Sequence, residues 1–208
     1  MIPVRPSKIV AVGRNYVEHA RELGNEVPEV PLLFLKPPSG LIGSGDAIVL
    51  PRVSRRVEFE AEIGVVIGSR VRGVSPEEAV RAIEGYTCLN DVTCRDLQKT
   101  DGQWGRAKGF DTFCPVGPRV ARGLDWRDLE LICRVNGEER QRARATMMHF
   151  SIPELVSFVS GIMTLEPGDL IATGTPAGTA PLRHGDLVEV DIPGVGVLSN
   201  PVQDSEIR

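Results

Sequence analysis

Three glutamates alternate with apolar residues in residues 57–63, and carboxylates at this spacing could bind a metal ion. Successive side chains of a strand point to opposite faces, so Glu58, Glu60 and Glu62 share one face. The predicted strand, residues 58–67, continues with both faces apolar and should therefore enter the interior, where neighbouring carboxylates repel unless a cation neutralises them. Two carboxylates at positions i and i+2 can converge on a hard cation through oxygen. The alternative is a strand with one solvated, glutamate-lined face.

A third oxygen ligand is available at Asp91, which ends a predicted strand and opens a polar turn at residues 92–98. Taken alone, Asp91 is also an ordinary turn residue. A ligand set made only of carboxylates, without histidine or cysteine nearby, selects magnesium, manganese or calcium over zinc.

His19 and Glu22 lie three positions apart on a short predicted helix, residues 15–24, and so share one face. A glutamate that fixes the tautomer of a histidine and stabilises its cation makes that histidine a competent general base. The alternative is an exposed helical ion pair. His149 and His184 have no such acidic partner and are assigned to structure or surface.

Two further residues could bind an anionic substrate. Lys108 lies in a predicted loop before Pro115 and could supply positive charge to an anion or an enolate. Thr175 lies in residues 174–178, directly after a predicted strand, where its hydroxyl and the backbone N–H groups could cradle a carboxylate. The alternatives are a solvated lysine and a plain turn.

The elements that must position these residues are mostly short strands bounded by turn residues. Asn136-Gly137 predicts a tight hairpin, because a type I′ turn needs positive φ at both central positions. Ser75 and Ser151 each begin a predicted helix with a capping box, and these helices should end near Gly85 and Gly161. The predicted strands are residues 9–12, 32–35, 47–50, 58–67, 129–135, 170–173 and 187–192.

Composition limits the fold and the partners. Glycine and proline supply 22 and 16 of the 208 residues, and strands do not alternate regularly with helices, which favours a strand-rich α+β fold. The net charge of −4, without a basic block, argues against nucleic acid as a partner. No apolar run is long enough to span a membrane, so we expect a cytoplasmic protein. The four cysteines match no metal motif and are expected to be buried free thiols.

Eight segments, in order along nearly the whole chain, resemble the fumarylacetoacetate hydrolase family, particularly its short single-domain acylpyruvases and oxaloacetate decarboxylases. The segments are residues 12–16 with His19 and Glu22, 33–37, 60–66, 90–93 with 95–98, Lys108 with 110–111, 135–137, 150–153 and 173–176.

The resemblance implies a single catalytic domain over residues 1–208, with the mixed-sheet roll of this family's C-terminal domain and a few peripheral helices. It further implies a homodimer and a helical flap that closes over the ligand. Glu60, Glu62 and Asp91 would bind Mg²⁺, with Mn²⁺ or Ca²⁺ as alternatives, and Glu58 would not be a ligand. His19 and Glu22 would activate water, and the substrate contacts would be Lys108, Arg95, Gln98 and Thr175.

The implied activity is metal-dependent chemistry on a small 2-oxo or 1,3-diketo acid through a pyruvate-type enolate. Acylpyruvate hydrolysis and oxaloacetate decarboxylation share that enolate. One alternative is an isomerase or decarboxylase of hydroxymuconate-type diacids, such as 5-carboxymethyl-2-hydroxymuconate or 2-hydroxyhepta-2,4-diene-1,7-dioate. Another is a non-catalytic metal-dependent binding protein, which would need neither the His19–Glu22 pair nor Lys108.

Overall fold

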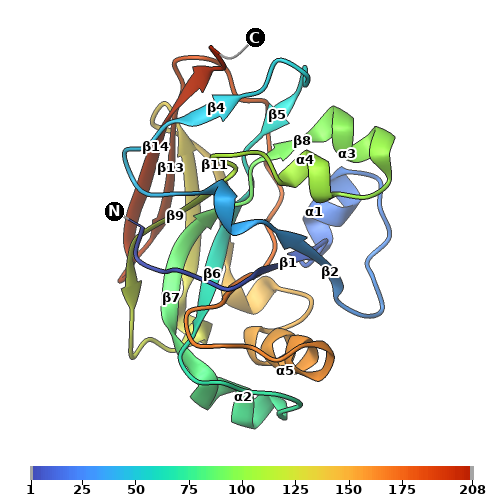
Figure 1. The fold of residues 1–208 in the computed structure, drawn as a ribbon, viewed down its shortest axis with the longest axis vertical. Coiled ribbons are helices and arrows are strands. Elements are labelled where there is room, and N and C mark those ends of the chain that lie inside the picture. Colours follow the sequence, from blue (N-terminus) through green and yellow to red (C-terminus); the bar gives the residue numbers. More distant parts are fainter. Residues whose placement is uncertain (1, 207–208) are drawn as a thin grey trace.

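A seven-stranded mixed sheet forms the centre of the computed structural model, which describes residues 2–206 (Figure 1). Its strand order is β2 (Leu32–Lys36), β1 (Ile9–Gly13), β12 (Leu170–Ala172), β6 (Ala61–Ile67), β7 (Ile83–Asn90), β9 (Cys114–Ala121) and β3 (Leu41–Ile42). All seven residues of β6 are buried, because β12 and β7 flank this strand and both faces of the sheet are covered.

A five-stranded sheet packs against the first one through contacts of β10, β13 and β14 with β6, β7 and β9. Its order is β11 (Glu138–Arg144), β10 (Glu130–Val135), β13 (Leu187–Ile192), β14 (Gly196–Asp204) and β4 (Ile48–Leu50). The hairpin between β10 and β11 is confirmed, because Asn136 and Gly137 have φ of 54° and 80°. The chain therefore has the predicted strand-rich α+β architecture.

The glutamate-bearing segment differs from its prediction. It is not one strand but two, β5 (Val57–Glu58) and β6, separated by Phe59 and Glu60. The chain leaves the sheet because β5 pairs with β8 (Thr93–Cys94), while the Glu60 N–H donates to the Asn90 side chain at 2.9 Å.

Short helices lie at the right and at the bottom of the molecule in Figure 1, and strands form its left side. The capping boxes at Ser75 and Ser151 are confirmed. The helices are α1 (Val17–Glu22), α2 (Pro76–Ala82), α3 (Arg95–Asp101), α4 (Gly105–Lys108) and α5 (Ile152–Ile162), with 3₁₀ turns η1 (Pro38–Gly40), η2 (Trp126–Asp128) and η3 (Ala145–Met147).

Several predicted boundaries are wrong for identifiable reasons. Helix α1 begins at Val17 and not at Asn15, because the Asn15 amide donates to the carbonyls of Phe150 and Thr173 and so ties two loops together. Gly85 lies inside β7, where a Cβ would collide with the backbone of the neighbouring β9. The predicted helix end near Gly161 is confirmed, because α5 ends at Ile162.

The region between β7 and β9 was also predicted incorrectly. The expected turn at residues 92–98 contains β8 and the start of α3, and Lys108 ends α4 where a loop was expected. These elements carry Arg95 and Lys108, whose side chains both contact Glu60, the residue that precedes β6.

Apolar side chains cover both faces of the seven-stranded sheet. Phe59, Ala61 and Ile63 belong to the core that lies between the two sheets. Val66 and Leu89 belong to a second cluster on the opposite face, with Ile9, Ala11, Leu170 and Ala172. The four cysteines are buried and free, as predicted. No helix within residues 2–206 combines the length and apolar character needed to cross a membrane.

Candidate metal centre and its cavity

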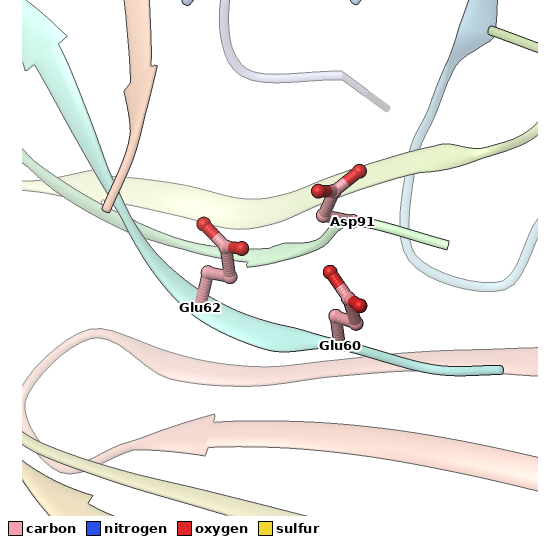
Figure 2. A group of neighbouring side chains, drawn as sticks. All are labelled: Glu60, Glu62 and Asp91. Atoms are coloured by element: carbon pink, nitrogen blue, oxygen red, sulfur yellow. The ribbon is translucent and has the colours of Figure 1, made fainter. Parts of the chain in front are cut away.

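Three buried carboxylates meet where β6 begins and β7 ends. Ala61 pairs with Asn90 across these antiparallel strands, so Glu60 and Asp91 lie beside each other, and the Asp91 N–H donates to the Glu60 carbonyl at 2.8 Å. Glu62 follows on the same strand. One oxygen of each of these three carboxylates lies within 4.8 Å of the other two, and the side chains point toward one another (Figure 2). The structure thus brings together the three predicted ligands.

Two buried lysines border this carboxylate group. Lys108 Nζ donates to Glu60 Oε2 at 2.7 Å and to Thr93 Oγ1 at 2.8 Å, and it also donates to Asp91 Oδ2. Lys36 Nζ lies 2.7 Å from Asp91 Oδ1 and donates to the backbone carbonyl of Lys108. Lys36 therefore fixes both the Asp91 carboxylate and the end of α4 that carries Lys108.

Arg95 connects the carboxylate group to a fourth buried glutamate. Its Nη2 donates to Glu60 Oε1 at 2.6 Å, its Nη1 donates to Gln98 Oε1 at 2.6 Å, and its Nε donates to Glu58 Oε2 at 2.8 Å. Glu58 also accepts from Arg56 Nε at 2.6 Å. Glu58 is consequently occupied by two arginines, and its carboxylate is not part of the group formed by the other three.

The pKa values of Glu60 and Glu62 shift in opposite directions. Burial alone would raise the pKa of Glu60, but the nearby charges of Lys108 and Arg95 more than offset burial and hold it well below its usual range. Burial raises the pKa of Glu62 well above its usual range, and the charges of Asp91 and Glu60 raise it further. Within residues 2–206, the only hydrogen bond to the Glu62 carboxylate comes from the Gly174 N–H at 2.8 Å.

These features fit a hard divalent cation. Glu62 is a buried carboxylate without a cationic partner in the described chain, and Asp91 Oδ1 accepts no well-aligned hydrogen bond there although Lys36 is close. The donors are all oxygen atoms, which suits magnesium, manganese or calcium. A cation among them would offset the burial and the carboxylate repulsion that together raise the pKa of Glu62.

The His19–Glu22 pair lies on α1 at the mouth of the same cavity. His19 Nδ1 is 3.1 Å from Glu22 Oε2, and the His19 side chain is buried close enough to Glu60 to help lower its pKa. Glu22 also accepts from the Gly178 N–H at 3.2 Å. The contact with Gly178 ties α1 to the loop that follows β12, so α1 covers the cavity in this structure.

Most of the predicted site residues line one cavity of about 390 Å³. Glu22 does not line it, but its carboxylate contacts His19, which does. Thr175 is held at its wall by Gln141 Nε2, which donates to the threonine hydroxyl at 2.8 Å. The predicted site residues that line the cavity are His19, Glu60, Glu62, Asp91, Arg95, Gln98, Lys108 and Thr175.

The prediction did not include several residues at the cavity. Phe34 and Trp104 form an apolar wall, with ring centroids 5.2 Å apart, and Lys108 Nζ lies 4.9 Å from the Phe34 centroid. Arg14, Asn25 and Lys99 also line the cavity. Lys36 is buried and does not line the cavity. Its signals in the sequence were its position in the 33–37 segment of the resemblance and its being one of only four lysines, against twenty arginines.

Comparison with known proteins gives the family. The family model described as fumarylacetoacetate (FAA) hydrolase C-terminal matches residues 8–203. The chain belongs to the fumarylacetoacetate hydrolase family. It is 42% identical to a mitochondrial oxaloacetate decarboxylase from Dictyostelium discoideum over 195 residues, which cover 90% of this chain and 89% of that protein.

Two further matches carry different names. A mitochondrial oxaloacetate tautomerase from Bos taurus is 40% identical over 210 aligned residues, covering 95% of this chain and 67% of that protein. The crystal structure of a 5-carboxymethyl-2-hydroxymuconate delta-isomerase from Mycobacterium smegmatis has 46% sequence identity and a TM-score of 0.93, covering 99% of this chain and 82% of that one. The relatives of this family member thus include a decarboxylase, a tautomerase and an isomerase.

Proposed function

We propose that this protein is a divalent-metal-dependent enzyme that acts on small 2-oxo acids through a pyruvate-type enolate. Among the reactions that share this enolate, we favour decarboxylation of oxaloacetate. The observation that carries the proposal is the group of three buried carboxylates with oxygens within 4.8 Å, at a cavity that also holds Lys108 and Arg95. Acylpyruvate hydrolysis would use the same enolate. The names of the relatives support the substrate class.

Glu60, Glu62 and Asp91 would hold the cation. When bound, a divalent cation supplies Lewis-acid polarisation of a 2-oxo group. The residues of the chain supply the remaining functions. Lys108 and Arg95 would attract the carboxylates of the substrate and stabilise negative charge that develops on its oxygens. Gln98 and Thr175 would orient the substrate by hydrogen bonds.

Decarboxylation breaks the bond between C3 and the distal carboxylate, and carbon dioxide leaves. The electron pair remains on C3, delocalised onto the 2-oxo group, until a proton is returned to C3. His19, in contact with Glu22, would deliver that proton or, in acylpyruvate hydrolysis, remove one from water. Phe34 and Trp104, which line the cavity in contact with each other, would limit access of bulk water and so strengthen the charge interactions inside it.

The second candidate function is isomerisation of a hydroxymuconate-type diacid. The structural match to the mycobacterial isomerase favours it. Isomerisation needs the same polarised 2-oxo acid and a base that moves a proton between carbons, so His19 would serve both reactions. The two candidates differ in product, because isomerisation releases no carbon dioxide.

The test is a turnover assay on the purified protein with magnesium or manganese. Oxaloacetate, an acylpyruvate and 5-carboxymethyl-2-hydroxymuconate are each followed by proton NMR, which distinguishes pyruvate from an isomerised diacid. The Glu60→Gln variant at the same metal concentration corrects for reaction catalysed by free metal. We expect pyruvate from oxaloacetate above that background. No turnover of any of these substrates would contradict the proposed function and favour a metal-dependent binding protein.

A further inference from the structure

Glu58 is the member of the glutamate motif that the proposed site does not use. Its side chain is 1% exposed, and it sits in β5 with its backbone paired to Thr93 on one side and bridged to Pro181 on the other. A carboxylate is costly to bury unless it is paired. Glu58 therefore needs an explanation apart from metal binding.

The partners of Glu58 indicate what it does. Both Nε and Nη2 of Arg95 lie 2.8 Å from Glu58 Oε2, so this carboxylate holds the edge of the guanidinium group that faces away from Gln98. Arg56 occupies the other oxygen at 2.6 Å. Glu58 thereby holds Arg95 at Nε, while Nη2 donates to Glu60 and Nη1 donates to Gln98, two residues that line the cavity.

Neutralising Arg95 does not by itself require Glu58. Arg95 already faces Glu60, and a buried ion pair adds little net stability once the cost of desolvating both groups is included. Glu60, however, would share its negative charge with a bound cation, which weakens its attraction for Arg95. Glu58 does not line the cavity, so its charge would remain with Arg95 and Arg56 when a cation binds Glu60.

The ion pairs of Glu58 and Arg95 belong to a longer row of alternating charges that includes Glu60 and Asp91. In order, this row is Arg56, Glu58, Arg95, Glu60, Lys108, Asp91 and Lys36, with each neighbouring pair joined by an ion pair. Glu58 is the position in the row that fixes Arg95 independently of the proposed metal ligands.

We infer that Glu58 is a positioning residue for Arg95. By holding Nε, it keeps the Nη side of the guanidinium group turned toward the cavity, where a substrate carboxylate would bind. It does so whether or not Glu60 is bound to a cation. This inference rests on the proposed function for the identity of the substrate. A positioning role predicts weaker substrate binding without Glu58, whereas a purely structural role predicts lower stability with unchanged kinetics in the protein that remains folded.

The test compares Glu58→Gln, which keeps the shape and removes the charge, with Glu58→Asp, which keeps the charge. The matched control is Glu84→Gln, because Glu84 also accepts from an arginine, Arg122 Nε at 2.6 Å, but lies at the far end of β7. Three quantities are measured: KM and kcat for oxaloacetate, Kd for Mn²⁺, and hydrogen exchange of the Arg95 Nε–H by NMR, assigned by its loss in Arg95→Lys.

In Glu58→Gln we expect KM to rise about tenfold or more, as for loss of a charge-assisted hydrogen bond, while kcat and the Mn²⁺ Kd change less than about threefold. The Arg95 Nε–H should exchange faster. Glu58→Asp should recover most of the loss, and Glu84→Gln should match the wild type.

An unchanged KM in folded Glu58→Gln overturns the inference. If Glu58→Gln does not fold, the wild type decides: the Arg95 Nε–H, which Glu58 accepts, should exchange slowly with and without Mn²⁺, and exchange as fast as that of an exposed arginine overturns the inference. If the wild type turns over no 2-oxo acid, the proposed function fails, and the Arg95 signal in Glu58→Gln alone then decides whether Glu58 positions Arg95.

Discussion

Glu62 differs from the neighbouring carboxylates because no cation of the described chain pairs with it, and this difference predicts opposite effects of two similar substitutions. Without metal, Glu62→Gln should stabilise the fold by about 1 kcal/mol, because it removes an unpaired buried charge, and Tm should rise by about 2–4 °C. Glu60→Gln should destabilise it by about 3 kcal/mol, since Lys108 and Arg95 lose a buried partner. Thermal unfolding in EDTA measures both, and a lower Tm for Glu62→Gln would contradict this account.

The same residue predicts how the stability of the metal-free protein depends on pH. The pKa of Glu62 in the folded protein is raised above its ordinary value of 4.5, so the folded state binds more protons than the unfolded state between 4.5 and the raised pKa. Its contribution to the free energy of unfolding therefore falls as pH rises through that window. Urea titrations in EDTA should show this slope, and Glu62→Gln should lack it. An identical pH profile for both proteins would exclude Glu62 as its source.

Removing the imidazole of His19 should separate hydrolysis from decarboxylation. Hydrolysis needs a base for water, so His19→Ala should lower kcat for an acylpyruvate by about 10² to 10⁴. Decarboxylation depends chiefly on stabilising the enolate, so kcat for oxaloacetate should fall less. Equal losses would mean that His19 positions the substrate or closes the cavity and is not the base.

At the scale of elements, α1 is the segment whose motion should matter most for function. It has six residues, too few for a stable helix in isolation, and is held over the cavity by the burial of His19 and the contact of Glu22 with Gly178. Amide hydrogen exchange in residues 15–31 should be faster than in β6 and β7, and it should slow when oxalate and Mn²⁺ are added. Exchange that ligand leaves unchanged would contradict a closing flap.

The accuracy of the sequence prediction also depended on the element. Strand alternation correctly separated Phe59, Ala61 and Ile63 from the glutamates, because burial of one face fixes that pattern. It missed the break before β6, which depends on the Asn90 side chain and on β8. Helix α4 has only four residues, and tertiary contacts such as that of Lys108 with Thr93 hold it in place.

At the scale of the whole molecule, contacts between distant segments were the hardest to predict. Lys36 bonds to the carbonyl of a residue 72 positions away, and the Gly174 N–H reaches Glu62 across 112 positions. Gly174 itself has φ of 96°, and a Cβ there would lie 2.8 Å from the Cβ of Asn15, so glycine lets these loops approach. Local patterns indicated which residues could do chemistry, but not which neighbours hold them.

The resemblance to the family also predicts the oligomeric state. We expect a homodimer in solution, so light scattering coupled to size-exclusion chromatography should give twice the mass of one chain over a tenfold range of concentration. A mass equal to one chain at every concentration would contradict it.

The central claim is that metal held by Glu60, Glu62 and Asp91 makes this protein an enzyme for 2-oxo acids. The most direct measurement is the rate of pyruvate formation from oxaloacetate by metal-stripped protein as Mn²⁺ is added, with Asp91→Asn as the background at each concentration. The account predicts a negligible rate without metal and a rise that saturates at one Mn²⁺ per chain. A rate that survives exhaustive chelation, or one that Asp91→Asn matches throughout, would contradict it.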